Sequence, residues 1–280
     1  MAAYDAVMEL WPVPYEEIDL STQFGTTHVV VSGPEDAPPL VLLHGFMNTL
    51  TIWIPNVTDL SKAYRLYAVD TMSQPSKSIP SAPMRSARDF VVWLGETLDG
   101  LGLDQTPIAG ISYGAWIAIN FALTNPQRVR KLVLLSPAGS FQPLATQFAM
   151  RAVLSGIIPT RGMMNSFFKW MGLEALPDDP FTERLLDLIW LGGTHFQNPP
   201  GSKRVMSDEL PDEALRALRL PVLLLMGENE VIYDSEKALD RARRLVPDLE
   251  GDLVADARHN MSASRPELVD ARILAFLEGS

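Results

Sequence analysis

The sequence contains no cysteine, and histidine is scarce. Without thiols the chain has no disulfide bond, no thiolate metal site and no cysteine nucleophile. Histidine is the side chain best suited to act as a catalytic base near neutral pH, and only four are present. Any base catalysis by histidine must therefore use His28, His44, His195 or His259.

Basic residues are fewer than acidic residues in this chain. It has 23 lysines and arginines and 34 aspartates and glutamates, which gives a formal net charge of -11. Such a surface repels polyanions, so we expect neither nucleic acid nor an anionic membrane as a partner. No apolar run approaches membrane-spanning length, and the segment Met1 to Leu10 carries acidic residues where a secretion signal carries basic ones. These observations predict a soluble, cytoplasmic protein.

Short apolar runs typical of buried strands alternate along the chain with amphipathic runs typical of helices. The expected strands are residues 18–20, 27–31, 39–45, 64–70, 106–112, 131–137, 221–227 and 249–255, and the expected helices are residues 50–61, 86–101, 113–125, 234–245 and 265–277. The first two strands are expected to form a hairpin at the sheet edge. Alternation at this spacing predicts an α/β protein with a mostly parallel sheet and helices on both faces.

Residues 138–218 interrupt this alternation. The interval is rich in methionine and aromatic residues, namely Phe148, Met150, Met163, Met164, Phe167, Phe168, Trp170, Met171 and Trp190. We interpret it as a helical cap, which leaves residues 1–137 and 219–280 as the core domain. Most of these side chains must form the interior of the cap itself, but those that face the sheet would roof an apolar substrate pocket. The residues expected to line this pocket are Phe46, Met47, Tyr113, Trp170, Trp190 and Ile232.

The stretch Gly110-Ile-Ser112-Tyr-Gly114 lies between a strand-like run and a helix-like run. A serine on so sharp a turn adopts a strained backbone, and only small residues two positions away on either side leave it room. The helix that follows directs its free N–H groups toward the serine, where they can stabilise an oxyanion. The pattern indicates a nucleophile elbow with Ser112 as the nucleophile, the alternative being an ordinary glycine-rich turn.

A serine nucleophile needs a base within hydrogen-bond reach and an acid that orients the base. His259 follows the last expected strand and precedes the last helix, so it lies at the sheet edge that also carries Ser112. The other histidines are weaker candidates, because His28 lies in an edge strand, His44 in a turn and His195 in the cap. We predict that His259 is the base, the alternative being a histidine of a surface loop.

Three carboxylates compete for the role of the acid in the loop 227–234, which reads Gly-Glu-Asn-Glu-Val-Ile-Tyr-Asp. Glu228 directly follows the strand and is expected to point away from the histidine. Asp234 begins the next helix, where aspartate commonly accepts hydrogen bonds from free backbone N–H groups. Glu230 stands at the tip of the loop. We predict Glu230 as the acid and keep Asp234 as the alternative.

An oxyanion hole requires two backbone N–H groups that converge on the carbonyl oxygen of the substrate. Tyr113 supplies one candidate N–H because it directly follows Ser112. Phe46 supplies the other, because Gly45 lets the chain bend inward after the strand at residues 39–45. Because the donors are backbone groups, we expect them irrespective of the side chains at these two positions.

The order of the expected site residues along the chain resembles the α/β-hydrolase superfamily. That order is His44-Gly45-Phe46, Ser112, Glu230 and His259. The resemblance implies an α/β-hydrolase fold with a mostly parallel eight-stranded sheet and a helical cap inserted after the sixth strand. It also implies that Ser112, Glu230 and His259 form a Ser-acid-His triad.

Two features are more closely similar to the bacterial carboxylesterases of the NP type, which cleave esters of arylpropionic acids. These features are the loop 227–234 and the pair Asn198-Pro199. Two positions depart from the wider superfamily, because Arg258 stands where many members have glycine and Glu230 where most have aspartate. Neither departure removes a functional group, so we expect altered loop geometry with activity retained.

The residues and the resemblance together predict a serine carboxylesterase that hydrolyses small to medium apolar carboxylic esters through an acyl-enzyme intermediate. The expected partner is a small-molecule ester, and no metal or organic cofactor is needed. The same triad also serves carbon–carbon bond hydrolases and lactone hydrolases, and a slow-turnover small-molecule receptor is a further alternative. Apolar residues exposed on the cap would favour a homodimer.

Overall fold

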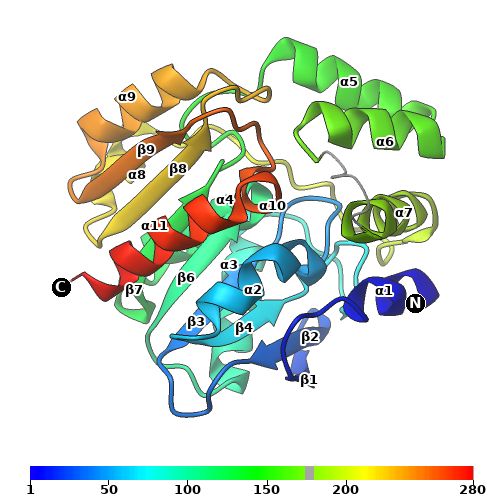
Figure 1. Cartoon of the computed structure of the whole chain (residues 1–280), viewed down its shortest axis with the longest axis horizontal. Helices are drawn as coiled ribbons and strands as arrows, with labels where there is room; N and C mark the ends of the chain where they lie inside the picture. The colour runs from blue at the N-terminus through cyan, green and yellow to red at the C-terminus, as the bar shows by residue number, and fades with distance from the viewer. Residues whose placement is uncertain (174–179, 280) are drawn as a thin grey trace.

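The computed structural model of the chain describes residues 1–173 and 180–279. Its centre is one β-sheet with helices on both faces (Figure 1). The long strands stand in the order β1 (Tyr15–Thr22), β2 (Gly25–Ser32), β4 (Arg65–Val69), β3 (Pro39–Leu43), β6 (Thr106–Ile111), β7 (Val129–Leu135), β8 (Val222–Gly227) and β9 (Leu249–Val254). The pairings of β1 with β2 and of β2 with β4 are antiparallel, and those from β4 onward to β9 are parallel. The predicted mostly parallel sheet is therefore confirmed.

The sheet has nine strands among the described residues, one more than the sequence predicts. The additional strand is β5 (Ile79–Pro80), which pairs with β2 over two residues. Two residues are too few to show an alternation of apolar and polar side chains, so the sequence carries no signal for β5. Among the long strands β7 is the sixth in chain order, and a helical insertion follows it as expected.

The central strands are continuous apolar runs because helices cover both of their faces. Leu40 to Leu43 in β3 are buried, as are all residues of β6 and β8. The edge strand β1 shows the other pattern, in which exposed residues alternate with half-buried ones. This contrast places the hydrophobic core around the strands that end at the candidate site.

Two helix pairs cover the faces of the sheet (Figure 1). On one face α2 (Ile54–Leu60) contacts α11 (Pro266–Glu278), and on the other α3 (Ala87–Gly100) contacts α4 (Tyr113–Thr124). The remaining helices outside the insertion are α1 (Ala2–Met8), the 3-10 helices η1 (Leu50–Trp53) and η2 (Pro126–Arg128), α8 (Asp212–Ala217), α9 (Ser235–Leu245) and α10 (Met261–Ser264). In the described part of the chain, no helix combines the length and apolar character needed to cross a membrane.

The insertion between β7 and β8 contains α5 (Thr146–Ile157), α6 (Arg161–Trp170) and α7 (Pro180–His195). These helices gather at one side of the sheet, where α7 lies beside α1 (Figure 1). Arg184 of α7 ties the two together, because it pairs with Glu9 at 3.1 Å. Within the predicted cap, residues 174–179 lie outside the described residues. The division of the chain into core and cap stays a prediction.

Candidate active site

Ser112 lies on the sharp turn between β6 and α4 and has a strained backbone, with φ 53° and ψ -110°. Gly110 and Gly114 allow the backbone segments around this turn to approach closely. A Cβ atom on Gly110 would lie 2.5 Å from the backbone nitrogen of Ala115, and one on Gly114 would lie 2.5 Å from the carbonyl oxygen of Leu43. Because both contacts are with backbone, a larger residue at either position would displace the turn itself.

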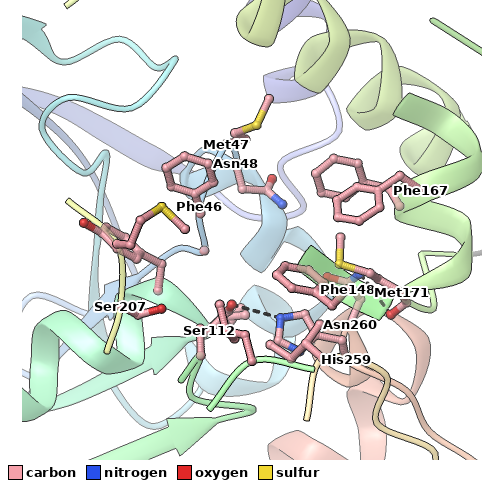
Figure 2. Close-up of a pocket in the computed structure, with 18 residues that line it drawn as sticks. Phe46, Met47, Asn48, Ser112, Phe148, Phe167, Met171, Ser207, His259 and Asn260 are labelled. Carbon is pink, nitrogen blue, oxygen red and sulfur yellow. Dashed lines mark hydrogen bonds between the residues drawn. The ribbon is translucent and has the colours of Figure 1, made fainter. Parts of the chain in front are cut away.

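Three side chains from three separate loops form one hydrogen-bonded chain. Ser112 Oγ lies 2.9 Å from His259 Nε2 (Figure 2), and His259 Nδ1 lies 3.0 Å from Glu230 Oε2. Since the carboxylate can only accept, the proton of the neutral imidazole belongs on Nδ1. The free Nε2 then faces the serine hydroxyl and can accept its proton.

The carboxylate of Glu230 is fully buried and tightly held. Its Oε1 accepts hydrogen bonds from the backbone N–H groups of Val231 at 2.8 Å and Ile232 at 3.1 Å. Burial raises the pKa of Glu230, but the attraction of His259 and the hydrogen bonds from His259 and Ile232 lower it by more, so the net shift of its pKa is downward. Glu230 therefore stays ionised at neutral pH and favours a positive charge on the imidazole.

The other two carboxylates of this loop form hydrogen bonds elsewhere. Asp234 caps α9, because its Oδ1 accepts from the Lys237 N–H at 3.1 Å. Glu228 turns to the neighbouring loop, where its Oε2 accepts from the Asp256 N–H at 3.1 Å. The structure therefore brings Glu230, and neither rival, to His259.

The other histidines do not reach Ser112. His28 pairs with Asp19 at 2.8 Å in the β1–β2 hairpin. His44 is fully buried, and its Nε2 accepts from the Thr71 N–H at 2.8 Å while its Nδ1 contacts the carbonyl oxygen of Gly45. Burial lowers the pKa of His44, so this ring holds loop backbone as a neutral imidazole. The fourth, at the end of α7, is exposed and contacts its own helix.

Near Ser112, the backbone N–H groups of Phe46 and Tyr113 have no acceptor among the described residues. Tyr113 occupies the first position of α4, where helical N–H groups lack a partner within the helix. The loop with Phe46 passes close by, because a Cβ atom on Gly45 would lie 3.4 Å from the Cβ of Ser112. This loop is anchored by the Met47 N–H, which donates to Gln74 Oε1 at 2.9 Å.

A cavity of about 100 Å³ opens onto Ser112 and His259 (Figure 2). Four of the residues expected to line a substrate pocket do line it, namely Phe46, Met47, Tyr113 and Ile232. The insertion contributes Ala138, Leu144, Phe148, Phe167, Phe168, Met171, Met206 and Ser207. The walls are therefore largely apolar, and the insertion supplies a large share of them.

Trp170 and Trp190 do not line this cavity, contrary to the expectation from the sequence. Trp190 Nε1 donates to the carbonyl oxygen of Pro159 at 2.9 Å, which ties α7 to the start of α6. The ring of Trp170 lies beneath the Arg151 guanidinium, 4.6 Å from its carbon to the ring centroid. Both tryptophans connect the helices of the insertion to one another.

Among residues 1–173 and 180–279, no cluster of three or more histidines and carboxylates could hold a metal ion. The site offers a hydroxyl, an imidazole, a carboxylate and backbone N–H groups.

Comparison with known proteins assigns the chain to a family. The model of the family described as alpha/beta hydrolase fold matches residues 38–157. "Uncharacterized carboxylesterase nap" of Bacillus subtilis (strain 168) is 39% identical over 279 residues, which span 98% of this chain and 90% of that protein. The chain belongs to the α/β-hydrolase family. "Carboxylesterase YbfK" of the same organism is 38% identical over 99% of this chain and 93% of its own length.

The fold of this α/β hydrolase also matches solved structures. The crystal structure of naproxen esterase (carboxylesterase NP) from Bacillus subtilis has a TM-score of 0.90 at 36% identity, and the match covers 99% of this chain and 96% of that one. The structure of carboxylesterase CesB (YbfK) from the same organism has the same TM-score at 35% identity, over 100% and 97% of the two chains. The resemblance to NP-type carboxylesterases is confirmed.

Several residues of this hydrolase's pocket were not singled out from the sequence. Phe148, Phe167, Phe168 and Met171 belong to the aromatic and methionine content that marks the insertion, but that content alone does not show which side chains face Ser112. Asn260 directly follows His259 and donates to the carbonyl oxygen of Met171 through its side chain at 3.2 Å and its backbone N–H at 3.0 Å. The sequence signal that could have identified Asn260 as a pocket residue is its position directly after His259.

Arg258, which directly precedes His259, is accommodated by the insertion. A Cβ atom on Gly172 would lie 2.8 Å from the Cβ of Arg258, and Gly172 has a φ of +91°. This glycine therefore leaves the space that Arg258 occupies. The histidine loop of this hydrolase is thus packed directly against the end of the second helix of the insertion, α6.

Proposed function

We propose that this chain is a serine carboxylesterase that hydrolyses small to medium apolar carboxylic esters. The observation that supports this most strongly is the hydrogen-bonded chain from Ser112 through His259 to the buried Glu230. The relatedness to carboxylesterases over nearly the whole chain supports the same activity. No step of the proposed reaction needs a metal or an organic cofactor.

In the first half of the reaction, Ser112 Oγ attacks the ester carbonyl carbon while His259 Nε2 accepts the serine proton. The ionised Glu230 stabilises the imidazolium that forms. The N–H groups of Phe46 and Tyr113 donate to the developing oxyanion. His259 then returns the proton to the leaving alcohol, and the acyl group stays on Ser112.

In the second half, water attacks the acyl-enzyme while His259 accepts a proton from it. Collapse of the second tetrahedral intermediate releases the carboxylic acid and restores the Ser112 hydroxyl with the same proton. The apolar walls formed by Met47, Ile232 and the phenylalanines of the insertion suit an apolar acyl or alcohol group.

We further propose that residues 138–218 act as a cap over the site. We also propose that the protein works in the cytoplasm and that it forms a homodimer. The cap is supported by the pocket residues that the insertion supplies. The dimer is supported by exposed apolar side chains on α5, with Met150 62% exposed and Ile157 71% exposed.

The test of the proposed function measures initial rates on p-nitrophenyl esters of increasing acyl length, and on a p-nitrophenyl ester of an arylpropionic acid. The native protein is compared with Ser112→Ala and Glu230→Gln. We expect Ser112→Ala to abolish turnover, and we expect Glu230→Gln to lower kcat about a thousandfold because an amide no longer stabilises the imidazolium.

Absence of turnover on every ester by the folded native protein would contradict esterase activity. Lactones and carbon–carbon bonded diketones are then assayed with the same variants. A ligand that raises the melting temperature without any turnover would favour the receptor alternative instead.

A further inference from the structure

A second cavity, of about 260 Å³, shares Phe46, Met47 and Tyr113 with the pocket at Ser112. We call it the side cavity. Its other walls come mainly from the loop after β4 at residues 73–75, from residues 192–196 at the end of α7, and from the segment 198–205. The two cavities therefore lie against the same part of the oxyanion loop.

The charge in the side cavity has one sign. Lys203 and Arg204 line it, whereas none of its described lining residues carries a carboxylate, although the chain has 34 acidic residues. Neither cation forms an ion pair within the described part of the chain. The Arg204 guanidinium lies over the ring of Phe46, with its carbon 5.0 Å from the ring centroid. This contact holds the positive charge at the boundary with the catalytic pocket.

The side cavity also has hydrogen-bonding groups that lack partners. The hydroxyls of Ser73 and Ser202 are shielded from solvent and make no hydrogen bond to any described residue. Ser73 additionally has a left-handed backbone, with φ 63°. Because an unpaired buried hydroxyl costs free energy, rotation of either serine side chain toward an acceptor bound in the side cavity would satisfy its hydroxyl. Two cations and two free hydroxyls without a carboxylate are a donor set for an anion.

Arg204 and the pocket at Ser112 both border one further cavity. A third cavity, of about 530 Å³, is lined by Arg204 and also by Leu144, Phe148, Phe167 and Met206, which line the pocket at Ser112 as well. A ligand with an apolar chain between two polar ends could therefore place one end at Ser112 and the other near Arg204.

We propose that the side cavity binds a carboxylate group, and that the enzyme prefers esters whose acyl chain ends in a carboxylate. Arg204 and Lys203 supply the charge, and Ser73 and Ser202 donate hydrogen bonds. The substrate part of this proposal rests on the proposed esterase function. A preference for an anionic substrate is the opposite of what the charge of the whole molecule favours, because a net charge of -11 by itself disfavours anionic substrates.

The test compares p-nitrophenyl hexanoate with the mono-p-nitrophenyl ester of adipic acid, two acyl chains of equal length that end in a methyl group and a carboxylate. The quantity measured is the ratio of kcat/KM for the charged ester to kcat/KM for the neutral one, at constant ionic strength. We expect Arg204→Gln to lower this ratio about tenfold, and Lys203→Gln to lower it less. Arg130→Gln is the matched control, because Arg130 is exposed on β7 and the variant loses the same charge. It should leave the ratio unchanged.

An equal fall in both rates in Arg204→Gln would overturn the proposal, because the arginine would then only support Phe46. A free carboxylate is tested separately by adding adipate to the hexanoate assay. If adipate changes the hexanoate rate in the native protein but not in Arg204→Gln, while the ratio stays constant, the cavity takes free carboxylates and the substrate assignment is wrong.

Failure of the esterase function has a different signature, which is the absence of turnover on both esters. The side cavity is then tested by the melting temperature in adipate. A rise in the native protein and in Arg130→Gln that is lost in Arg204→Gln would support carboxylate binding, and no rise in the native protein would overturn it.

Discussion

At the scale of single residues, the site depends on a serine held in an unfavourable backbone conformation. Ser112 has φ 53°, a region that costs residues with a Cβ atom about 1–3 kcal/mol. The turn persists because Gly110 and Gly114 allow β6, α4 and the end of β3 to approach closely. The position of the proposed nucleophile at the cavity is thus a consequence of two residues that take no part in the proposed chemistry.

Gly114→Ala tests this dependence. Its Cβ atom would meet the carbonyl oxygens of Leu43 at 2.5 Å and His44 at 2.6 Å, so the turn must shift. We expect the free energy of unfolding to fall by about 1–3 kcal/mol and ester hydrolysis to fall at least tenfold. Gly162→Ala is the control, because a Cβ atom there has open space on α6 and should keep or raise stability. Equal behaviour of the two variants in urea unfolding and initial-rate assays would contradict the dependence of the turn on a residue without a Cβ atom at position 114.

Asp234→Ala separates the helix cap from the acid of the triad. Loss of the hydrogen bond to the Lys237 N–H should lower the free energy of unfolding by about 1 kcal/mol. Because Asp234 makes no contact with His259, kcat/KM on a p-nitrophenyl ester should stay at the native value. A loss of kcat as large as that of Glu230→Gln would transfer the role of the acid to Asp234.

At the scale of elements, α2 and α11 pack together around a buried polar pair behind the histidine loop. Asn56 Nδ2 donates to Asp270 Oδ1 at 2.8 Å and to the carbonyl oxygen of Ser262 in α10 at 3.1 Å. Asn56 Oδ1 and Asp270 Oδ2 have no partner among the described residues. Burial raises the pKa of Asp270 from 3.8 to about 7, and the nearby charge of Asp59 adds to the rise. A protonated carboxyl supplies a donor that the ionised form lacks.

This pair makes the stability of the protein depend on pH. In the unfolded chain Asp270 ionises near 3.8, whereas in the folded chain it keeps its proton up to about 7. The folded state therefore binds more protons in this interval, and the contribution of Asp270 to stability falls as the pH rises from about 4 to 7.

Asp270→Asn should remove this dependence, because the amide keeps a donor at every pH. We expect the free energy of unfolding of the variant to exceed the native value by on the order of a few kcal/mol at pH 7, with the difference shrinking toward pH 4. Urea unfolding across this range measures it, and Asp240→Asn on the exposed face of α9 is the control. A difference that does not change with pH would contradict a raised pKa at Asp270.

At the scale of the whole molecule, the insertion both builds the pocket and exposes an apolar surface. Met150, Val153, Leu154 and Ile157 are spaced as one stripe along α5 and are between 50% and 71% exposed. The opposite side of the same segment contributes Phe148 to the cavity at Ser112. A surface of this kind is unusual on an isolated monomer and is typical of an interface.

Sedimentation velocity tests whether a second copy of the chain covers this stripe. We expect the native protein to sediment as a dimer and the double variant Leu154→Glu, Ile157→Glu to sediment as a monomer, because two buried carboxylates without partners would oppose association. Ser166→Glu, an exposed position on α6, is the control and should remain dimeric. A monomeric native protein would contradict the proposed homodimer.

Local signals in the sequence were sufficient for part of the fold and of the site. Apolar runs identified the central strands, because buried parallel strands need apolar residues on both faces. Alternating side chains identified the edge hairpin, whereas β5 was too short to be recognised. The flanking glycines singled out Ser112, the place after the last strand singled out His259, and the structure brings the two side chains within 2.9 Å of each other. Trp170 and Trp190 were misplaced because composition shows that a helix is aromatic but not which surface each ring will meet.

The alternation of strands and helices and the strained turn at Ser112 can be predicted from local sequence, because both follow from the sterics and hydrophobicity of neighbouring residues. The carboxylate that reaches His259 can be assigned only from the folded structure. Glu230 and Asp234 are four positions apart in one loop, and the path of that loop directs Glu230 inward while Asp234 caps α9. The same holds for the cationic side cavity, whose walls come from segments far apart in the chain. Contacts of this kind depend on how the loops and the insertion pack against the sheet, which no local pattern of residues encodes.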